Sequence, residues 1–320
     1  MDRRTFVSGL AMALVGAPTS GRAQTTGRPP RVVLYTTTPV WKDTIVARLR
    51  ELGWVEGTSV VVEWRDPESD AALETDLRQW VRSPVEVFVM GGPLRIRAAM
   101  KATRSIPIVG IDLESDPVAS GFVKSLARPG MNVSGIWMDL PELAGKQLQF
   151  LREVLPTLRR VGIVWDDRIG APQLAQARAA ARASNVTLHP VPLHTTAEAD
   201  DVIKRLLRER PQAIVLLTAP VVFSALPRFA DLARQHRLPS ISPFSTYPSS
   251  GGLLAYGPDF PTMWRQTADY VDRILKGAQI ADLPVERPSK FVLGVSVKTA
   301  KALGLTIPLS LLARADQVIE

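Results

Sequence analysis

The predicted fold follows from residues 106–135, which read IPIVGIDLESDPVASGFVKSLARPGMNVSG. A short apolar run, Ile106–Ile111, leads into an acidic, turn-forming cluster, Asp112–Pro117. An amphipathic segment, Val118–Leu126, follows, and a second apolar run spans Val133–Met138. This order predicts a buried strand, a polar loop at its carboxyl end, a helix and another strand. Ligands of open α/β sheets bind outside the carboxyl ends of the strands, so this polar loop is the first candidate for a functional site.

The same alternation of apolar runs and amphipathic segments extends to both sides of this stretch. The loops between the segments are short, which predicts parallel sheets with helices on both faces. A chain of 320 residues is long enough for about two such units. Before the opening stretch we expect strands at 31–35, 60–64 and 85–90 and helices at 40–52, 73–81 and 94–103. After it we expect helices at 141–155, 173–184, 199–208 and 224–236, and strands at 161–165, 187–193, 213–217, 239–242 and 253–256.

The segments after residue 256 are too few for a third domain. They comprise a long helix at 260–277, an extended piece at 283–290, a strand at 291–297 and short helices at 298–303 and 309–315. We expect them to return to the first two units, so that the chain crosses between the units more than once. Several crossings form a hinge, and two lobes on a hinge enclose a cleft that can close on a ligand.

The composition excludes some kinds of binding partner and some kinds of chemical site. The net charge is +8, but the basic residues are spread among acidic ones, so we expect a solvated surface and no nucleic-acid partner. The chain has no cysteine. Disulfides, thiolate metal sites and a lipid-modified N-terminal cysteine are therefore excluded, and the protein is not expected to be a lipoprotein.

The first 23 residues have the pattern of a bacterial export signal. Two arginines, Arg3 and Arg4, precede a weakly apolar run from Phe6 to Pro18, and small residues surround a cleavage point after Ala23. The paired arginines followed by Phe6 indicate the twin-arginine variant. The alternative is a disordered tail or a surface helix. No later segment reaches about 18 consecutive apolar residues, so we expect a soluble protein exported to the periplasm.

No catalytic, metal-binding or cofactor-binding set is evident. The three histidines, His189, His194 and His236, have no acidic or histidine partners at metal-ligand spacing. A G-x-S-x-G nucleophile motif is absent, as are a Walker A sequence and a G-x-G-x-x-G motif after the first strand. We therefore assign no catalytic residue, no metal and no cofactor. Polar strand-end loops without such a set are more typical of binding than of turnover.

Candidate binding groups follow the ends of the predicted strands. Gly91 and Gly92 precede a helix whose N-terminus suits an anion, unless these glycines serve only the geometry of the turn. The acidic residues of the 112–116 loop, Asp112, Glu114 and Asp116, either bind an ammonium group or, for Asp116, cap a helix. Aromatic residues near strand ends would form the walls of an apolar site. The selected ligand-binding residues are Thr37, Trp41, Gly91, Gly92, Pro93, Asp112, Asp116, Trp165, Asp166, Thr218, Phe244 and Tyr247.

Several motifs spread over nearly all of residues 31–320 resemble one known family. They are LRELGWVEG at 49–57, DPV at 116–118, LARPGMNVSG at 126–135, GKQL at 145–148, YGP at 256–258, LPVE at 283–286 and KTAKALGLTIP at 298–308. They resemble the ABC-transporter substrate-binding proteins often labelled tryptophan/tyrosine transport system, which have a type 1 periplasmic-binding-protein fold.

The resemblance implies an α/β fold of two Rossmann-like lobes with parallel sheets and a hinge of three crossings. Lobe one would comprise 31–138 plus 258–289, and lobe two 139–257 plus 290–320. The implied role is capture of a small molecule, an amino acid or related organic acid, by a monomer that delivers it to an ABC permease in the inner membrane.

Two departures from the family pattern concern the ligand. The loop after the first strand, 36–41, is about ten residues shorter than in the family, so the family's ligand class does not transfer directly. Asp112 and Glu114 are more acidic than their counterparts in many relatives, which favours a cationic group. The alternatives are an α/β enzyme, such as a racemase or hydrolase that uses cleft carboxylates, and a ligand-sensing receptor module.

Overall fold

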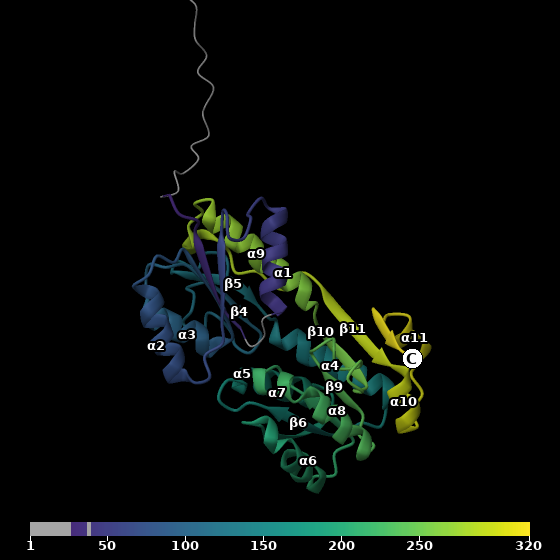
Figure 1. The fold of residues 1–320 in the computed structure, drawn as a ribbon. Helices are drawn as coiled ribbons and strands as arrows, with labels where there is room; N and C mark the ends of the chain where they lie inside the picture. Colours follow the sequence, from purple (N-terminus) through teal and green to yellow (C-terminus); the bar gives the residue numbers. More distant parts are fainter. Residues whose placement is uncertain (1–26, 37–39) are drawn as a thin grey trace, which may run out of the picture.

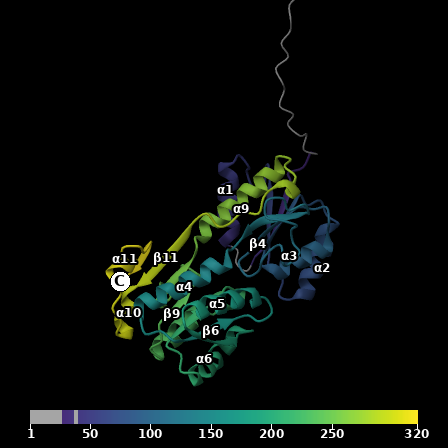
Figure 2. The same ribbon diagram turned by 180° about the vertical axis from the view of Figure 1, so that it is seen from behind.

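A computed structural model gives the fold, and the structure describes residues 27–36 and 40–320 (Figure 1). The predicted export signal at 1–23 and the candidate Thr37 lie outside these ranges. Two α/β units make up the described chain, and the second view shows α9 (Phe260–Leu275) on the first unit and β11 (Phe291–Ser296) extending to the second (Figure 2). Among the helices of the described ranges, none is both long enough and apolar enough to cross a bilayer.

The first sheet is parallel throughout, with strand order β2-β1-β3-β4-β5. Side chains alternate between its faces. In β1, Val32 and Leu34 pack with α1 and α9, whereas Val33 and Tyr35 pack with α2 and α3. Both faces are buried, so these strands can consist almost entirely of apolar residues. The elements of this unit are β1 (Arg31–Tyr35), α1 (Val40–Glu51), β2 (Val61–Arg65), α2 (Asp70–Val81), β3 (Val87–Gly91), α3 (Pro93–Ala102), β4 (Ile108–Asp112), β5 (Val133–Trp137), α9 (Phe260–Leu275) and η2 (Ile280–Asp282).

The second sheet has the order β12-β11-β10-β9-β8-β6-β7. Val161 and Ile163 of β6 pack with α4 and α5, whereas Val164 packs with α6 and α8 on the other face. The elements are α4 (Leu140–Val154), β6 (Arg160–Trp165), α5 (Ala171–Ala183), β7 (Thr187–Pro192), η1 (Thr196–Glu198), α6 (Ala199–Arg208), β8 (Ala213–Leu216), α7 (Pro220–Ser224), α8 (Leu226–Gln235), β9 (Ser240–Ser242), β10 (Leu254–Pro258), β11 (Phe291–Ser296), α10 (Val297–Leu303), α11 (Leu309–Leu312) and β12 (Gln317–Ile319).

One strand pair departs from the expected parallel arrangement. β10 and β11 are antiparallel, whereas the other pairs of this sheet are parallel. The reason is the path of the chain. β10 leads out of the second sheet into α9, which packs on the first sheet, and β11 returns from that side and so runs in the opposite direction.

Three segments connect the two units: the step from β5 to α4, the step from β10 to α9, and the extended segment 283–290 that precedes β11. The third segment pairs with β5. The Glu286 N–H donates to the Gly135 carbonyl at 2.9 Å, and the Trp137 N–H donates to the Glu286 carbonyl at 3.0 Å. The lobe limits given above, 31–138 plus 258–289 and 139–257 plus 290–320, stay a prediction.

The helix expected at Val118–Leu126 does not form, and the segment consists of turns. Its first residues are held by Asp116, whose Oδ1 accepts the backbone N–H groups of Val118 and Ala119, both at 2.8 Å. Gly121 then has a φ of +71°, which an α-helix does not allow. Phe122 and Val123 are nevertheless buried, so the apolar pattern predicted burial correctly and the element type wrongly. The C-terminal strand β12 was not predicted at all.

Gly135 explains why β4 and β5 can pair closely. Its φ is +137°, and a Cβ there would lie 2.1 Å from the carbonyl oxygen of Gly110 on the neighbouring strand. Only glycine fits such a position. Gly135 is the last residue of the motif at 126–135. It is therefore needed for the close pairing of β5 with β4, the strand that leads into the acidic loop.

Candidate functional site

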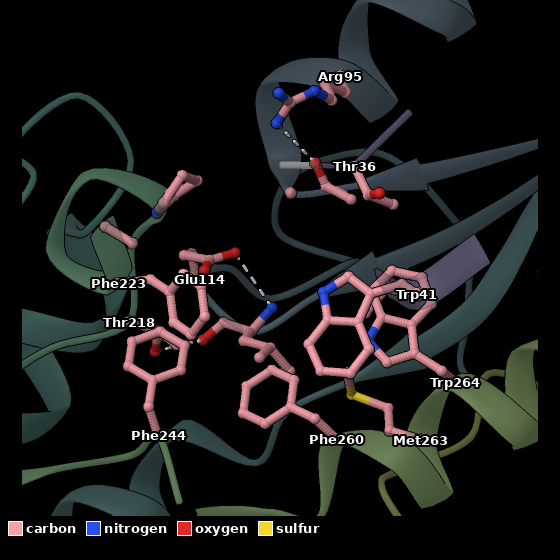
Figure 3. Close-up of a pocket in the computed structure, with 16 residues that line it drawn as sticks. Thr36, Trp41, Arg95, Glu114, Thr218, Phe223, Phe244, Phe260, Met263 and Trp264 are labelled. Atoms are coloured by element: carbon pink, nitrogen blue, oxygen red, sulfur yellow. Dashed lines mark hydrogen bonds between the residues drawn. The ribbon is translucent and has the colours of Figure 1, made fainter. Parts of the chain in front are cut away.

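One pocket lies where the carboxyl ends of strands from both sheets meet, the location expected for an open α/β fold. It contains about 610 Å³ of space not filled by protein atoms, including its open mouth. Both units contribute to the lining, which consists of Thr36, Trp41, Gly91, Gly92, Arg95, Ile111, Leu113, Glu114, Thr218, Ala219, Pro220, Phe223, Phe244, Phe260, Met263 and Trp264 (Figure 3).

Aromatic rings form a continuous wall along one side. Trp41 stacks between Trp264 and Phe260, with ring centroids 5.4 Å and 5.7 Å away. Phe260 also stacks on Phe244 at 5.5 Å, and Phe223 meets Phe244 edge-on at 4.9 Å. The wall therefore runs from α1 and α9 on the first sheet to α7 and the loop after β9 on the second. Flat, polarisable faces of this kind suit an apolar or aromatic ligand group.

Glu114 is the acidic residue of the lining. Its residue exposure is only 6%, and its Oε2 accepts the Leu113 N–H at 3.2 Å. Burial, and next the neighbouring carboxylate of Asp112, raise the pKa of Glu114 well above its usual range. No Lys, Arg or His of the described ranges forms an ion pair with either carboxylate.

Asp112 lies beneath the pocket and holds the loop together. It is fully buried, and its Oδ1 accepts the N–H groups of Glu114 at 2.8 Å and Ser115 at 3.0 Å. Its Oδ2 accepts the Trp137 indole N–H at 3.2 Å and the Ser115 hydroxyl. Burial raises the pKa of Asp112, and these hydrogen bonds oppose that rise. Because both oxygens are occupied, Asp112 shapes the loop that presents Glu114.

Arg95 lies at another part of the pocket, near the start of α3. Its Nη2 donates to Asp66 at 2.8 Å, and its Nη1 lies 3.5 Å from the Gly91 carbonyl oxygen. Gly92 has a φ of +83°, which glycine adopts readily, and its N–H donates to the Ile111 carbonyl at 2.8 Å. The turn therefore needs Gly92 for its geometry. The donors available to an anion there are the first N–H groups of α3, which have no acceptor within the helix.

Thr218 connects the two sheets. Its hydroxyl lies 2.7 Å from Gln173 Oε1 and 3.3 Å from the Leu113 carbonyl oxygen, which belongs to the acidic loop of the first unit. Gln173 also bonds the backbone of Thr218, accepting its N–H at 2.9 Å and donating to its carbonyl at 2.8 Å. All three residues are buried. The strand end of β8 is thereby fixed against the loop that contains Glu114.

Five of the residues selected from the sequence line this pocket: Trp41, Gly91, Gly92, Thr218 and Phe244. Two more lie directly next to it. Pro93 is the buried first residue of α3, and Asp112 lies under Glu114.

Four other selected residues lie elsewhere. Asp116 is exposed and holds its own turn, and Trp165 is half-buried against the core under α5. Asp166 is buried and forms an ion pair with Arg168 at 2.6 Å. Tyr247 is fully buried, with its hydroxyl 2.8 Å from that of Ser240. These four side chains are not part of the lining.

The selection from the sequence did not include several lining residues. Phe260, Met263 and Trp264 come from the first turns of α9, at the spacing that places side chains on one helix face. Asp259 caps the N-terminus of this helix by accepting the Thr262 N–H at 2.9 Å. An aspartate at this position predicts where the helix starts, but it does not predict that the helix lines a pocket. Arg95 and Phe223 carry no comparable signal, because each lies on a helix surface whose orientation depends on the fold.

A two-lobed α/β protein whose pocket is lined by both lobes is, by architecture, a ligand-binding protein of the kind that closes around small molecules. The comparison with family models agrees. The chain belongs to the ABC transporter substrate binding protein family, whose model matches residues 41–319. It is thus a substrate-binding protein of an ABC system with the fold of the type 1 periplasmic binding proteins.

Individual relatives are distant in sequence and close in fold. A tyrosine-binding protein of Clostridioides difficile (strain R20291) is 22% identical over 267 residues, covering 82% of this chain and 76% of that protein. A conserved domain protein from Vibrio cholerae superposes with a TM-score of 0.84 at 24% identity, covering 91% of this chain and all of the other. An ABC domain from Streptococcus pneumonia in complex with L-Trp gives 0.83 at 22% identity, with the same coverage.

Proposed function

We propose that the protein captures a small molecule with a flat apolar group and a charged end, an amino acid or related organic acid, in the pocket between its sheets. The observation that supports this most is the aromatic wall built from both lobes, with Arg95 and Glu114 at separate places in the same pocket (Figure 3). A ligand that contacts both lobes only when they are closed favours the closed state.

We place the carboxylate end of such a ligand near Arg95, which lines the pocket. A carboxylate there would face the guanidinium group and the N-terminal N–H groups of α3, whose dipole favours negative charge. Thr36 lines the same part of the pocket and accepts the Trp64 indole N–H at 3.1 Å. The flat group of the ligand would then extend along the aromatic wall.

The relatives narrow the first choice of ligands to test. One is named a tyrosine-binding protein, and one solved structure contains L-Trp. Aromatic amino acids fit the ring-lined pocket of this chain, so L-tryptophan, L-tyrosine and L-phenylalanine form the core of the test set. The remaining amino acids and small organic acids complete it.

Thermal-shift screening of the purified protein against this set tests the proposal. At a hundred times Kd a ligand that binds only the native state adds about 2.7 kcal/mol of stability, which raises Tm measurably. We expect at least one member to raise Tm. Trp41→Ala should reduce affinity by at least about thirtyfold, as loss of a central aromatic contact does. Trp54→Ala is the matched control, because Trp54 bonds Asp272 away from the pocket and should leave affinity unchanged.

Failure of every compound to shift Tm would contradict the proposal, and so would equal losses of affinity in the two tryptophan variants. We also propose that binding is not followed by catalysis, in contrast to a racemase or hydrolase. Nuclear magnetic resonance of the bound compound after prolonged incubation should show unchanged structure and configuration. Appearance of a product would support the enzyme alternative.

For the cellular setting we propose export by the twin-arginine route to the periplasm, where the protein acts as a soluble monomer and delivers its ligand to an ABC permease. The basis is the predicted signal at 1–23 together with the family membership. The double variant Arg3→Lys/Arg4→Lys should accumulate uncleaved in the cytoplasm. Unaltered export of this variant would contradict the twin-arginine assignment.

A further inference from the structure

We propose that Glu114 recognises a protonated amine of the ligand and is the residue that makes the pocket selective for ammonium-bearing solutes. The inference rests on the proposed function, because it assigns chemistry to the same pocket. The sequence alone does not distinguish Glu114 as a binding residue from its acidic neighbours Asp112 and Asp116.

The three acidic side chains of the loop have different surroundings. Asp112 is enclosed by hydrogen bonds from Trp137 and from its own loop, so it has no free oxygen for a ligand. Asp116 is exposed and accepts two backbone N–H groups of the following turn. Glu114 alone of the three lines the pocket, although it is almost fully buried.

Within the described part of the chain, Glu114 has no basic partner that would stabilise its ionised form. A buried carboxylate is unfavourable without a counter-charge or several hydrogen bonds. Glu114 accepts one N–H, from Leu113, and no basic side chain of residues 27–36 or 40–320 pairs with it. Arg95 on α3 pairs with Asp66, and Arg168 after β6 pairs with Asp166. A ligand cation would therefore supply the counter-charge that the ionised form of Glu114 lacks.

The surroundings of Glu114 also favour a cation over water. Phe223 and Phe244, whose rings meet edge-on, line the same pocket as Glu114 (Figure 3). The faces of aromatic rings attract ammonium groups, and this attraction strengthens when water is excluded. Thr218 fixes the loop through the Leu113 carbonyl, so Glu114 is presented by a supported backbone.

Binding of a cation should change the protonation state of Glu114. Asp112 from the end of β4 and Asp166 from the end of β6 face Glu114 with negative charge, while Arg95 across the pocket is paired. Burial and the neighbouring Asp112 raise the pKa of Glu114, which favours the protonated carboxyl group in the free protein. An ammonium group stabilises the ionised carboxylate. Binding should therefore release up to one proton from the protein at neutral pH.

The experiment is calorimetric titration of the whole protein with matched compounds. L-tryptophan, L-tyrosine and L-phenylalanine are each compared with the deaminated acid of the same ring and chain length and with the decarboxylated amine. We expect the deaminated acid to bind at least about thirtyfold more weakly than its amino acid, as for loss of one partner of a buried charge pair. Two buffers of different ionisation enthalpy should reveal proton release for the amino acid and for its decarboxylated amine, but not for the deaminated acid.

Glu114→Gln keeps the shape of the side chain and removes its charge. It should bring the amino acid and its deaminated acid to similar affinities and abolish the proton release. Asp116→Asn is the matched control, because it alters an exposed carboxylate outside the lining and should change neither quantity. A merely structural role for Glu114 would weaken all compounds equally and leave their ratio unchanged.

Two results would contradict the role proposed for Glu114, and only the second would also contradict the proposed function. Equal affinities of the unchanged protein for the amino acids and for their deaminated acids would remove the role of Glu114 and leave solute capture in this pocket intact. Absence of binding by all compounds, amines included, would overturn the proposed function together with the inference.

Discussion

Glu114 is maintained in the free protein at a cost to its stability. A carboxyl group whose pKa is higher in the folded than in the unfolded protein binds more protons when folded. Its effect on stability is therefore absent below the unfolded pKa, near 4.5, and becomes increasingly unfavourable as pH rises above it. Binding residues that destabilise the free fold are common, because function needs the unpaired group.

Glu114→Gln should accordingly stabilise the free protein at neutral pH. The substitution removes the need to keep a proton on a buried acid, and its advantage should vanish as the pH falls to about 4.5. Urea unfolding without ligand, repeated between pH 4 and pH 8, measures the difference. An advantage of the same size at every pH would indicate a packing effect and not the titration of Glu114.

Two glycines on neighbouring elements allow a paired test of backbone geometry. Gly135→Ala should destabilise the protein by about 3 kcal/mol or more, because its φ is +137° and its new Cβ would lie 2.1 Å from Gly110 O. Gly145→Ala, in an exposed position of α4 with no atom within 4 Å, should stabilise it by about 0.5–1 kcal/mol. Denaturant unfolding of both variants measures these changes, and an equal effect of the two would contradict the geometry.

Whether a pocket residue could be predicted from the sequence depended on the structural feature that positions it. Trp41, Thr218 and Phe244 follow strand ends or begin helices, so the alternation of elements was enough to bring them to the pocket. Tyr247 follows the same rule and yet points into the core, because the chain turns once more after Phe244. Arg95 and Phe260 required the orientation of whole helices, which local sequence does not contain.

At the scale of elements, α9 has the largest influence on the site. It follows β10 of the second sheet in the sequence and packs beside α1 on the first sheet, as both views show (Figures 1 and 2). Its N-terminal turns provide Phe260, Met263 and Trp264 to the pocket. Further along, its surface is linked to α1 by Arg265 and Glu51 at 2.6 Å and by Arg48 and Asp269 at 2.8 Å.

This helix contact should contribute to acid sensitivity. Hydrogen bonds from Arg265 and then Arg48 lower the pKa of Glu51 from 4.5 to about 2. A lowered pKa stabilises the fold above pH 4.5, and this contribution is lost as the pH falls towards 2. Glu51→Gln should therefore flatten unfolding stability in that window. Since the Glu51 side chain is exposed, the effect should be small and should shrink in high salt, and an unchanged acid profile would contradict it.

The types of most elements could be read from periodicity, and the exceptions have local causes. The segment 118–126 has a helical apolar pattern but follows an Asp-Pro turn and contains Gly121 at positive φ. The segment 224–236 was expected as one helix. In the structure α7 ends at Ser224 and α8 begins at Leu226, just before Pro227. Proline is accepted in the first turn of a helix and so marks a new start.

At the scale of the whole molecule, the pocket exists only where the two sheets approach each other. Alternating elements predicted two α/β units, and the family motifs predicted their class, which the family model and the solved structures confirm. The antiparallel β10–β11 pair and the residues that meet across the pocket depend on the path of the chain between the units. No local pattern in the sequence specifies that path.

Closure on the ligand should be visible in solution. We expect small-angle X-ray scattering to give a smaller radius of gyration with a saturating amino acid ligand than without it, because a pocket lined by both lobes gains contacts on closing. Thr218→Val, which removes the hydroxyl near Leu113 O, should reduce this change. An unchanged radius despite saturation would indicate a rigid pocket.

The most direct test of the central claim is a crystal structure of the protein grown with the amino acid that raises Tm most. The ligand should lie between the sheets, with its ring against Trp41 and Phe244 and its ammonium group within hydrogen-bond distance of Glu114. Ligand density outside this pocket, or an orientation with the ammonium group away from Glu114, would contradict the account.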